Sequence, residues 1–361
     1  MNIKEIMPDG RDVWDILAET DKPIAVYGTG NGVDKLIDVC TEKGIRIADF
    51  FASDGFVRDR MFHGKKVLSY GGVSEKYDDF IVVVGFGSHL PEVMENVRKI
   101  SLERETYIPE LPVSDGVIFD KEFYFSHEKD IAAAREMFSD MESRRLFDDI
   151  VAYRLSGKPE FLSRTTTPKE IFTKILDAEN FRVTADLGAY DGDSIRELAG
   201  FAPSLEKVVA FEPDERSFRK LTAFAESGIP YTVETINAAA WNESGTLDFT
   251  AEGNRNSTLS STAGIKAGAK IKKVRVEKPD DFLSENCDYI KFDVEGAELR
   301  ALAGCAETIY RAKPQLLVSA YHRSEDIFEL PRLIHGMGYK KLFFRRYAGF
   351  PAWDLNILAT D

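Results

Sequence analysis

The sequence contains few cysteines and no long hydrophobic run. Its three cysteines, Cys40, Cys287 and Cys305, are widely spaced in a chain of 361 residues and form no CxxC pair, which argues against a disulfide framework or a zinc ribbon. We therefore predict that each cysteine is a small buried apolar residue. The most apolar stretch, Phe80–Leu90, is far shorter than the ~20 residues of a membrane-spanning helix. Because the N-terminus also has no apolar signal-peptide core, we expect a cytoplasmic protein that does not insert into membranes.

The sequence also lacks an excess of positive charge. It has 47 basic and 61 acidic residues, which gives a net charge of −14. This balance argues against nonspecific nucleic-acid binding, which needs basic residues to neutralise phosphates, and against a basic helix that lies on a membrane surface. A composition that is 43% hydrophobic and 30% charged predicts a folded protein, and its length is typical of two domains.

Residues 1–115 alternate apolar strand-like runs with helical spacing, which predicts a small Rossmann-like α/β domain. The first run, Lys22–Gly32, reads KPIAVYGTGNG and contains Gly28, Gly30 and Gly32. These glycines, with Asp54 after the second strand, look like a nucleotide pocket, although the third glycine comes one position too early for GxGxxG. Two interpretations stay open: a nucleotide-sugar site, or an accessory domain for packing, dimerisation or substrate presentation.

Residues 116–166 form a predicted helical connector. Apolar residues recur at helical spacing between Lys121 and Leu162, among them Ile131, Ala134 and Ile150. We expect that a homodimer, if one forms, uses this connector or the N-terminal domain.

Residues 167–361 return to the α/β pattern. The predicted strands are Arg182–Leu187, Lys207–Glu212, Thr232–Ala239, Asp288–Asp293, Gln315–Ala320, Lys340–Tyr347 and Asp354–Ala359. The predicted helices are Pro168–Ala178, Ser194–Phe201, Glu215–Glu226, Gly296–Tyr310 and Ser324–Met337. The link AGFPAW between the last two strands is too short for a helical crossover, so these strands should form an antiparallel hairpin at the edge of a parallel sheet.

A nucleotide-type site is predicted at the first turn of this domain. Gly188 and Gly192 in DLGAYDGDS allow a sharp turn into a helix, and Glu212 at the tip of the next strand could accept hydrogen bonds from ribose hydroxyls. NAD and S-adenosylmethionine (SAM) both fit this pair. Asp186 favours SAM, because its carboxylate would repel a pyrophosphate but attract the α-ammonium of a methionine group.

Five blocks, DLGAYDGDS, AFEPD, INAAAW, DYIKFDVEGAELRAL and VSAYHRSEDIFELP, closely resemble the FkbM family of SAM-dependent methyltransferases, in the family's order. The resemblance implies a class I methyltransferase fold, a Rossmann-like seven-stranded sheet with a reversed last strand. It also implies O-methylation, often of a sugar hydroxyl in a polysaccharide or glycosylated metabolite. The resemblance further implies cofactor-binding roles for Asp186, Gly188, Ala189, Gly192, Ser194, Glu212, Pro213, Asp214, Asn237, Ala238 and Asp293, and it places Tyr321 and His322 at the tip of the fifth strand.

His322 is the predicted general base, because an ordinary imidazole pKa of ~6.5 suits proton transfer near neutrality. Asp293 could orient this imidazole, act as the base itself or hold the cationic cofactor. Tyr321 and Glu295 are expected to contact the substrate. Asp293, Glu295 and Glu298 with His322 could instead bind a divalent metal, but we expect none.

Two other functions compete with methyl transfer. One is an NAD-dependent nucleotide-sugar oxidoreductase, and the other is a noncatalytic scaffold that retains the cofactor fold. Asp186 and the missing GxGxxG fingerprint argue against the first, and the set of acidic strand tips with His322 argues against the second. The block Asp-Val-Glu-Gly at the fourth strand also differs from the Pro-Pro-aromatic block of enzymes that methylate nucleobases, so a small-molecule or glycan hydroxyl is the expected acceptor.

Overall fold

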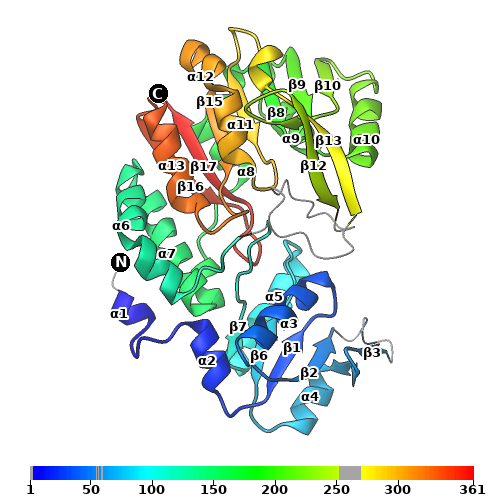
Figure 1. Ribbon diagram of the computed structural model, residues 1–361, viewed down its shortest axis with the longest axis vertical. Coiled ribbons are helices and arrows are strands. Elements are labelled where there is room, and N and C mark those ends of the chain that lie inside the picture. Colours follow the sequence, from blue (N-terminus) through cyan, green and yellow to red (C-terminus); the bar gives the residue numbers. More distant parts are fainter. Residues whose placement is uncertain (1–2, 54, 56, 58–59, 115, 252–269) are drawn as a thin grey trace.

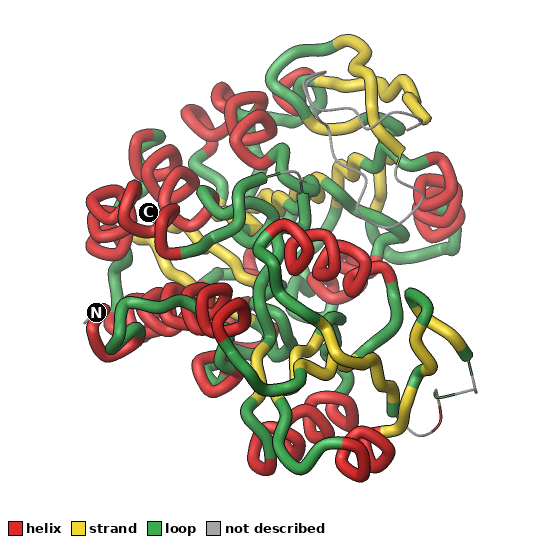
Figure 2. The backbone as a smooth tube through the Cα atoms, turned by 60° about the horizontal axis from the view of Figure 1, so that its bottom comes forward, coloured by secondary structure: helices red, strands yellow, loops and turns green. Residues whose placement is uncertain are grey.

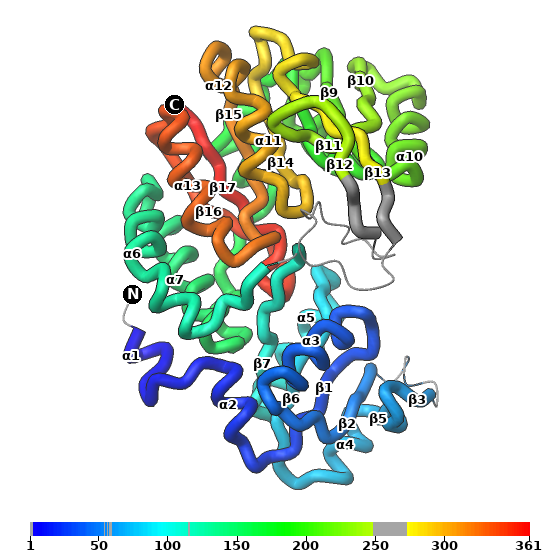
Figure 3. Tube along the Cα trace, in the orientation of Figure 1, coloured from blue at the N-terminus to red at the C-terminus, as the bar shows by residue number. Residues whose placement is uncertain are grey.

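The computed structural model describes residues 3–53, 55, 57, 60–114, 116–251 and 270–361 (Figure 1). An N-terminal α/β unit, drawn in blue and cyan, lies at one end of the molecule, and a larger α/β unit, from green to red, lies at the other. Figure 3 traces the passage between them through α6 (Lys121–Met137) and α7 (Met141–Ser156), and Figure 2 shows helices on both sides of the strands. The mixed α/β fold predicted from the sequence is confirmed, whereas the domain boundaries remain predictions.

The N-terminal sheet is parallel, with five strands in the order β5-β2-β1-β6-β7. The neighbouring strands β1 and β6 are buried along their whole length, as their continuous apolar runs predicted. Its strands are β1 (Ile24–Tyr27), β2 (Ile47–Ala52), β5 (Leu68–Ser69), β6 (Ile81–Val84) and β7 (Thr106–Tyr107), and a separate antiparallel pair is formed by β3 (Met61–Phe62) and β4 (Lys65–Lys66). The helices are α1 (Ile3–Ile6), α2 (Val13–Glu19), α3 (Asn31–Glu42), α4 (Tyr70–Lys76) and α5 (Pro91–Glu103).

The connector consists of α6 (Lys121–Met137), α7 (Met141–Ser156) and the short turn η2 (Pro159–Leu162). Asp120 and Asp140 cap the N-termini of α6 and α7 by accepting backbone N–H groups. The rings of Phe138 and Phe147 pack on Phe344. The predicted helical connector is therefore part of the core and not a free linker (Figure 1).

The C-terminal sheet has seven strands in the order β10-β9-β8-β14-β15-β17-β16. All neighbours are parallel except that β17 pairs antiparallel with both β15 and β16. The short AGFPAW link thus places a reversed strand next to the edge, as predicted. The strands are β8 (Val183–Leu187), β9 (Lys207–Phe211), β10 (Thr232–Ile236), β14 (Tyr289–Phe292), β15 (Gln315–Ser319), β16 (Lys341–Arg346) and β17 (Leu355–Thr360). The helices are α8 (Pro168–Glu170), α9 (Asp193–Ala199), α10 (Glu215–Ala225), α11 (Glu298–Gly304), α12 (Ala306–Ala312) and α13 (Asp326–Gly336).

Several predicted elements are wrong in detail. The predicted helix Gly296–Tyr310 is two helices, because Asp280, in the turn η5 (Pro279–Asp281), accepts the backbone N–H groups of Glu307 and Thr308 and starts α12 anew. The predicted helix Pro168–Ala178 is only α8, the π-helical turn η3 (Ile171–Ile175) and the start of η4 (Ala178–Asn180).

The small sheet of β11 (Ala239–Ala240), β12 (Gly245–Ala251) and β13 (Lys270–Glu277) was not predicted. The predicted strand Thr232–Ala239 is also too long: it ends at Ile236, because Ala239 pairs with β13 in this second sheet. The three cysteines are buried and free, as predicted.

Candidate functional site

The three acidic residues predicted at strand tips lie on adjacent strands. Because β9, β8 and β14 are neighbours and parallel, their carboxyl ends meet at one edge of the sheet, where open α/β sheets bind ligands. Asp186 lies in β8, Glu212 follows β9, and Asp293 follows β14. The structure therefore brings these carboxylates to one edge, as the sequence predicted.

The glycine loop after β8 is held against its neighbours. The N–H groups of Gly188 and Ala189 donate to the carbonyl of Phe211 at 3.0 and 2.9 Å. Gly188 has φ +93°, and a Cβ there would lie 1.9 Å from the Asp293 carbonyl oxygen. Gly192, with φ +87°, would place a Cβ 2.4 Å from the Phe224 ring. Both positions thus require glycine for conformation and close packing.

Glu212 is fixed by the backbone around it. Its carboxylate accepts N–H groups from Asp214 at 2.7 Å and Tyr190 at 2.9 Å. Burial raises the pKa of Glu212 to about 7, although these hydrogen bonds oppose the shift. The Asn237 side chain donates to the Glu212 carbonyl at 2.8 Å. Hydrogen bonds therefore fix both the carboxylate and the backbone carbonyl of Glu212, the residue predicted to bind the ribose.

Other residues at this tip serve the fold. Asp214 caps α10 by accepting the N–H groups of Arg216 and Ser217, and Ala238 is fully buried. Pro213 stands between Glu212 and this cap. The structure does not test their predicted place beside the adenine.

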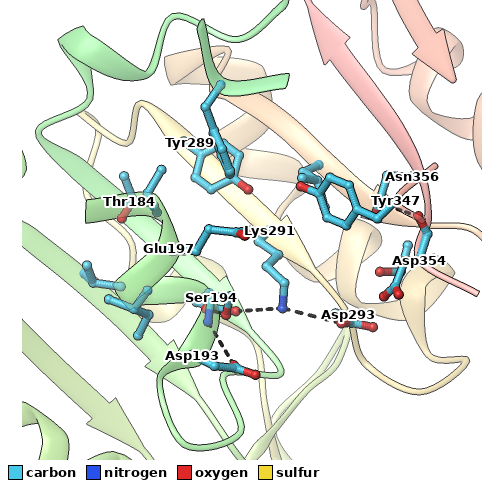
Figure 4. Close-up of a pocket in the computed structure, with 18 residues that line it drawn as sticks. Thr184, Asp193, Ser194, Glu197, Tyr289, Lys291, Asp293, Tyr347, Asp354 and Asn356 are labelled. Atoms are coloured by element: carbon cyan, nitrogen blue, oxygen red, sulfur yellow. Dashed lines mark hydrogen bonds and ion pairs between the residues drawn. The ribbon is translucent and has the colours of Figure 1, made fainter. Parts of the chain in front are cut away.

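Lys291 is a residue of the site that the sequence reasoning missed. It extends from β14 so that its Nζ lies 3.3 Å from Asp186 Oδ1 and 3.5 Å from Asp293 Oδ2 (Figure 4). Ser194 donates its hydroxyl to the other oxygen of Asp186. The only signal in the sequence was a lysine inside the otherwise apolar strand YIKF.

His322 lies at the centre of an acidic cluster. Its side chain is 0% exposed, and its Nδ1 lies 2.9 Å from Glu298 Oε1. Its Nε2 faces Asp293 Oδ1 at 3.5 Å and Glu295 Oε2 at 3.6 Å. Tyr321 donates its hydroxyl to Asp293 Oδ1 at 3.3 Å. Asp293 therefore links the predicted cofactor side to the predicted acceptor side.

The protonation of this cluster differs from the sequence prediction. Burial alone would lower the pKa of His322, but the surrounding carboxylates, Glu298 first among them, raise it to about 10. A pKa this far above 6.5 favours the protonated imidazole at neutral pH, so the argument from an ordinary imidazole pKa does not apply. The role of His322 in proton transfer stays a prediction. Partial withdrawal from water, together with the nearby carboxylates of Asp293 and Glu298, raises the pKa of Glu295 to about 7, while 43% of its side chain stays exposed.

Asp293, Glu298 and His322 are the group of described residues that could hold a metal ion, since one ligand atom from each lies within 4.8 Å of the others. In this arrangement, however, His322 Nδ1 and Glu298 Oε1 already lie 2.9 Å apart as an ion pair, and a metal would have to separate them. The expectation that no metal binds stays a prediction.

The N-terminal half of the chain reaches this cluster through Ser114. Its backbone N–H donates to the His322 carbonyl at 3.1 Å, and its hydroxyl donates to the Glu295 carbonyl at 2.7 Å. Glu295 has φ +55°, an uncommon conformation for a residue other than glycine. Ser114 therefore stabilises a strained turn at Glu295. No local sequence pattern predicts this contact.

Two of the three glycines in the N-terminal cluster pack closely against the protein itself. A Cβ on Gly28 would lie 2.8 Å from the Phe86 ring, and one on Gly32 would lie 2.7 Å from the Gly85 carbonyl oxygen. These glycines permit the loop after β1 and the first turn of α3 to pack tightly against the loop that follows β6. This favours the packing interpretation over a nucleotide pocket, and Asp54 lies outside the described residues.

The seven-stranded sheet, in which β17 runs antiparallel to both of its neighbours, has the Rossmann-like fold expected of a methyltransferase domain. Residues 186–341 match the family model described as Methyltransferase FkbM domain. The chain therefore contains an FkbM methyltransferase domain, as its motifs predicted, and the protein is a methyltransferase.

The fold is similar to that of solved structures. The crystal structure of methyltransferase FkbM from Methylobacillus flagellatus KT is 16% identical, with a TM-score of 0.68 over 99% of this chain and 92% of that one. Aeropyrum pernix fibrillarin with bound SAM is 13% identical, with a TM-score of 0.33 over 50% of this chain and 66% of that one. A SAM-dependent methyltransferase from Aquifex aeolicus is 12% identical, with a TM-score of 0.30 over 56% of this chain and 97% of that one.

No curated protein sequence matches the chain. Among the described residues, no helix combines the length and the apolar character needed to cross a membrane.

Proposed function

We propose that the protein transfers the methyl group of SAM to a hydroxyl of a sugar, in a polysaccharide or a glycosylated metabolite. The observation that carries this proposal is the row of carboxylates at the tips of β8, β9 and β14, inside an FkbM methyltransferase domain. The acceptor class rests on the family resemblance and on the acidic cluster around His322.

The chain's own residues suit a cofactor with a ribose and a cationic amino-acid group. Each oxygen of Glu212 accepts one backbone N–H and retains a lone pair for a ribose hydroxyl. Asp186 and Asp293 offer negative charge to the α-ammonium. When bound, SAM supplies an electrophilic methyl group on a sulfonium, so that positioning of the acceptor opposite that methyl provides much of the acceleration.

The acceptor hydroxyl must lose its proton as the new C–O bond forms and the C–S bond breaks. His322 is fully buried and protonated at neutral pH, so it acts on the acceptor through the carboxylates that it contacts. Glu295 is the exposed member with a pKa of about 7, which suits a general base. We therefore propose that Glu295 is the general base that accepts the proton of the acceptor hydroxyl. His322 and Asp293 are positioning residues, and Tyr321 lies beside the substrate.

The test is methyl transfer from tritiated SAM to a panel of glycosides, nucleotide sugars and polysaccharides, with the methylated atom located by NMR. We expect Glu295→Gln and His322→Ala each to lower turnover roughly 100-fold or more and to leave the affinity for S-adenosylhomocysteine (SAH) nearly unchanged. Tyr310→Phe, at an exposed side chain of α12, is the control. Chelation with EDTA should change nothing, because no proposed step uses a metal.

Methyl transfer to nitrogen or carbon would contradict the hydroxyl proposal. Wild-type turnover in both variants would remove the assigned proton path. If His322→Ala turns over at the wild-type rate while Glu295→Gln does not, His322 loses its positioning role and Glu295 remains the proposed base.

The observations support the two competing functions less than they support methyl transfer. The FkbM domain and the buried carboxylate of Asp186 argue against an NAD-dependent oxidoreductase, because that carboxylate would repel a pyrophosphate. A noncatalytic scaffold gives no reason for the acidic cluster around His322, which the tips of β14 and β15 bring together. A cytoplasmic location, no binding of nucleic acid and a homodimer remain proposals; Phe125 and Met141, exposed on the connector helices, are where a dimer contact would be sought.

A further inference from the structure

A cavity of about 230 Å³ lies between α9 and the strands β8, β14, β15 and β17 (Figure 4). It begins at the carboxylates of the proposed cofactor site. Its lining carries the acidic side chains of Asp186, Asp193, Glu197, Asp293 and Asp354 but one cation, Lys291. The lining of the cavity is thus predominantly acidic, and Lys291 is the charged group in it that could pair with an anion.

The register of the sheet fixes this lysine. Lys291 of β14 stands opposite Asp186 of β8, so the two side chains lie on the same face as neighbours. Burial would lower the pKa of Lys291, but Asp186 and Asp293 outweigh it and raise the pKa above its ordinary value. The ammonium group therefore stays charged and forms ion pairs with both carboxylates, which offset one of their two negative charges.

These are the two carboxylates that the proposed function offers to the α-ammonium of SAM. Two ammonium groups cannot share them without repulsion. The methionine group also carries an α-carboxylate, which needs a cationic partner in a cavity whose other ionisable groups are acidic.

We propose that Lys291 is the residue that recognises the α-carboxylate of the cofactor. In the ligand-free protein its Nζ occupies the ammonium subsite between Asp186 and Asp293. On binding, the α-ammonium takes this subsite, and the Nζ moves to the α-carboxylate. This inference rests on the proposed function, and it makes Lys291 the group that selects a cofactor with a complete amino-acid end.

The test compares three ligands by calorimetry: SAH, its analogue without the carboxylate (S-adenosyl-3-thiopropylamine), and 5′-methylthioadenosine, which lacks the amino-acid end. We expect the wild type to bind SAH roughly tenfold to 100-fold more tightly than the analogue, as for a hydrogen bond between charged groups. Lys291→Met should lose this preference, and its affinity for the analogue should be unchanged or higher. Lys291→Arg should retain the preference in part.

The outcomes separate the hypotheses. If Lys291 only forms ion pairs with Asp186 and Asp293, the Lys291→Met variant will change its affinity for SAH and for the analogue by the same factor, which overturns the inference. A wild type that binds SAH and the analogue equally overturns it without any variant, even if Lys291→Met fails to fold. A wild type that binds none of the three ligands overturns the proposed function as well.

Discussion

The two parallel sheets of the chain share one construction and differ at their strand tips. In the C-terminal sheet, Asp186, Glu212 and Asp293 stand at the ends of three adjacent strands. In the N-terminal sheet, the residues that follow β1, β2 and β6 are Gly28, Ser53 and Gly85, none of which is charged. One sheet carries carboxylates at its strand tips, and the other has small uncharged residues there.

The glycines of the two sheets show the same difference. Gly188 brings its turn against the carbonyl of Asp293, next to the acidic tips, whereas Gly32 brings α3 against the carbonyl of Gly85. A glycine-rich turn therefore indicates a close approach of backbone. The neighbouring side chains decide whether that approach serves a ligand or only packing.

The N-terminal half is nevertheless connected to the site. Ser88 and Phe350 exchange backbone hydrogen bonds at 2.8 and 3.0 Å, and Ser114 holds the turn at Glu295. Arg154 of α7 forms a buried ion pair with Glu110 at 3.1 Å and donates to the Ser324 carbonyl at 3.3 Å. The two sheets thus differ in the side chains at their strand tips, although both halves of the chain help to position the acidic cluster.

The largest expected effect comes from Gly188→Ala. A Cβ 1.9 Å from the Asp293 carbonyl, at φ +93°, forces the turn and the tip of β14 apart. We expect SAH binding to be lost and the free energy of unfolding to fall by about 3 kcal/mol or more. Calorimetry with SAH and urea unfolding measure the two effects.

Matched substitutions in the N-terminal sheet sharpen this comparison. Gly30 has no atom within 4 Å of a built Cβ, so Gly30→Ala should behave as the wild type. Gly32→Ala, with a Cβ 2.7 Å from the Gly85 carbonyl oxygen, should lower stability and leave the SAH affinity of the folded protein intact. Loss of SAH binding in Gly32→Ala would show that the two sheets are not separate in function.

A second prediction concerns the buried pair of His322 and Glu298. Glu298→Gln leaves a buried imidazolium without its nearest carboxylate, which should reduce the free energy of unfolding by about 3 kcal/mol at neutral pH. The pKa of His322 is raised from 6.5 to about 10, so its contribution to stability is full below pH 6.5 and is lost as the pH rises through 10.

Urea unfolding of wild type and Glu298→Gln at several pH values between 6.5 and 10 would check this. The wild type should lose stability across that range, and the variant should lose less, because the leading cause of the raised pKa is gone. Glu95→Gln, which removes an exposed ion pair on α5, should follow the wild-type profile. Parallel profiles for all three proteins would contradict the predicted protonation of His322.

Local sequence signals predicted more of the fold than of the site. Strand runs and helix spacing, together with the length of the AGFPAW link, are enough to predict a reversed last strand, and family motifs locate the acidic tips. The ion pair of Lys291 with Asp186 depends on the register between β14 and β8, which neither strand encodes alone. Ser114 and Glu295 are separated by 181 positions, so only the folded chain shows their contact. The shifted pKa of His322 likewise requires the carboxylates that surround it in space.

The smallest predicted effect is a pH dependence of cofactor affinity. Ribose hydroxyls donate to the ionised form of Glu212, whose pKa is raised to about 7. If the protonated form does not bind, the affinity for SAH should fall roughly tenfold from pH 8 to pH 6. Glu212→Gln should bind weakly with a flatter profile, because the titrating group is absent. Ser53→Ala, at the tip of β2 in the N-terminal sheet, should retain the wild-type profile. A profile in Glu212→Gln as steep as in the wild type would assign the titration to another group and remove Glu212 as the acidic tip that receives the ribose.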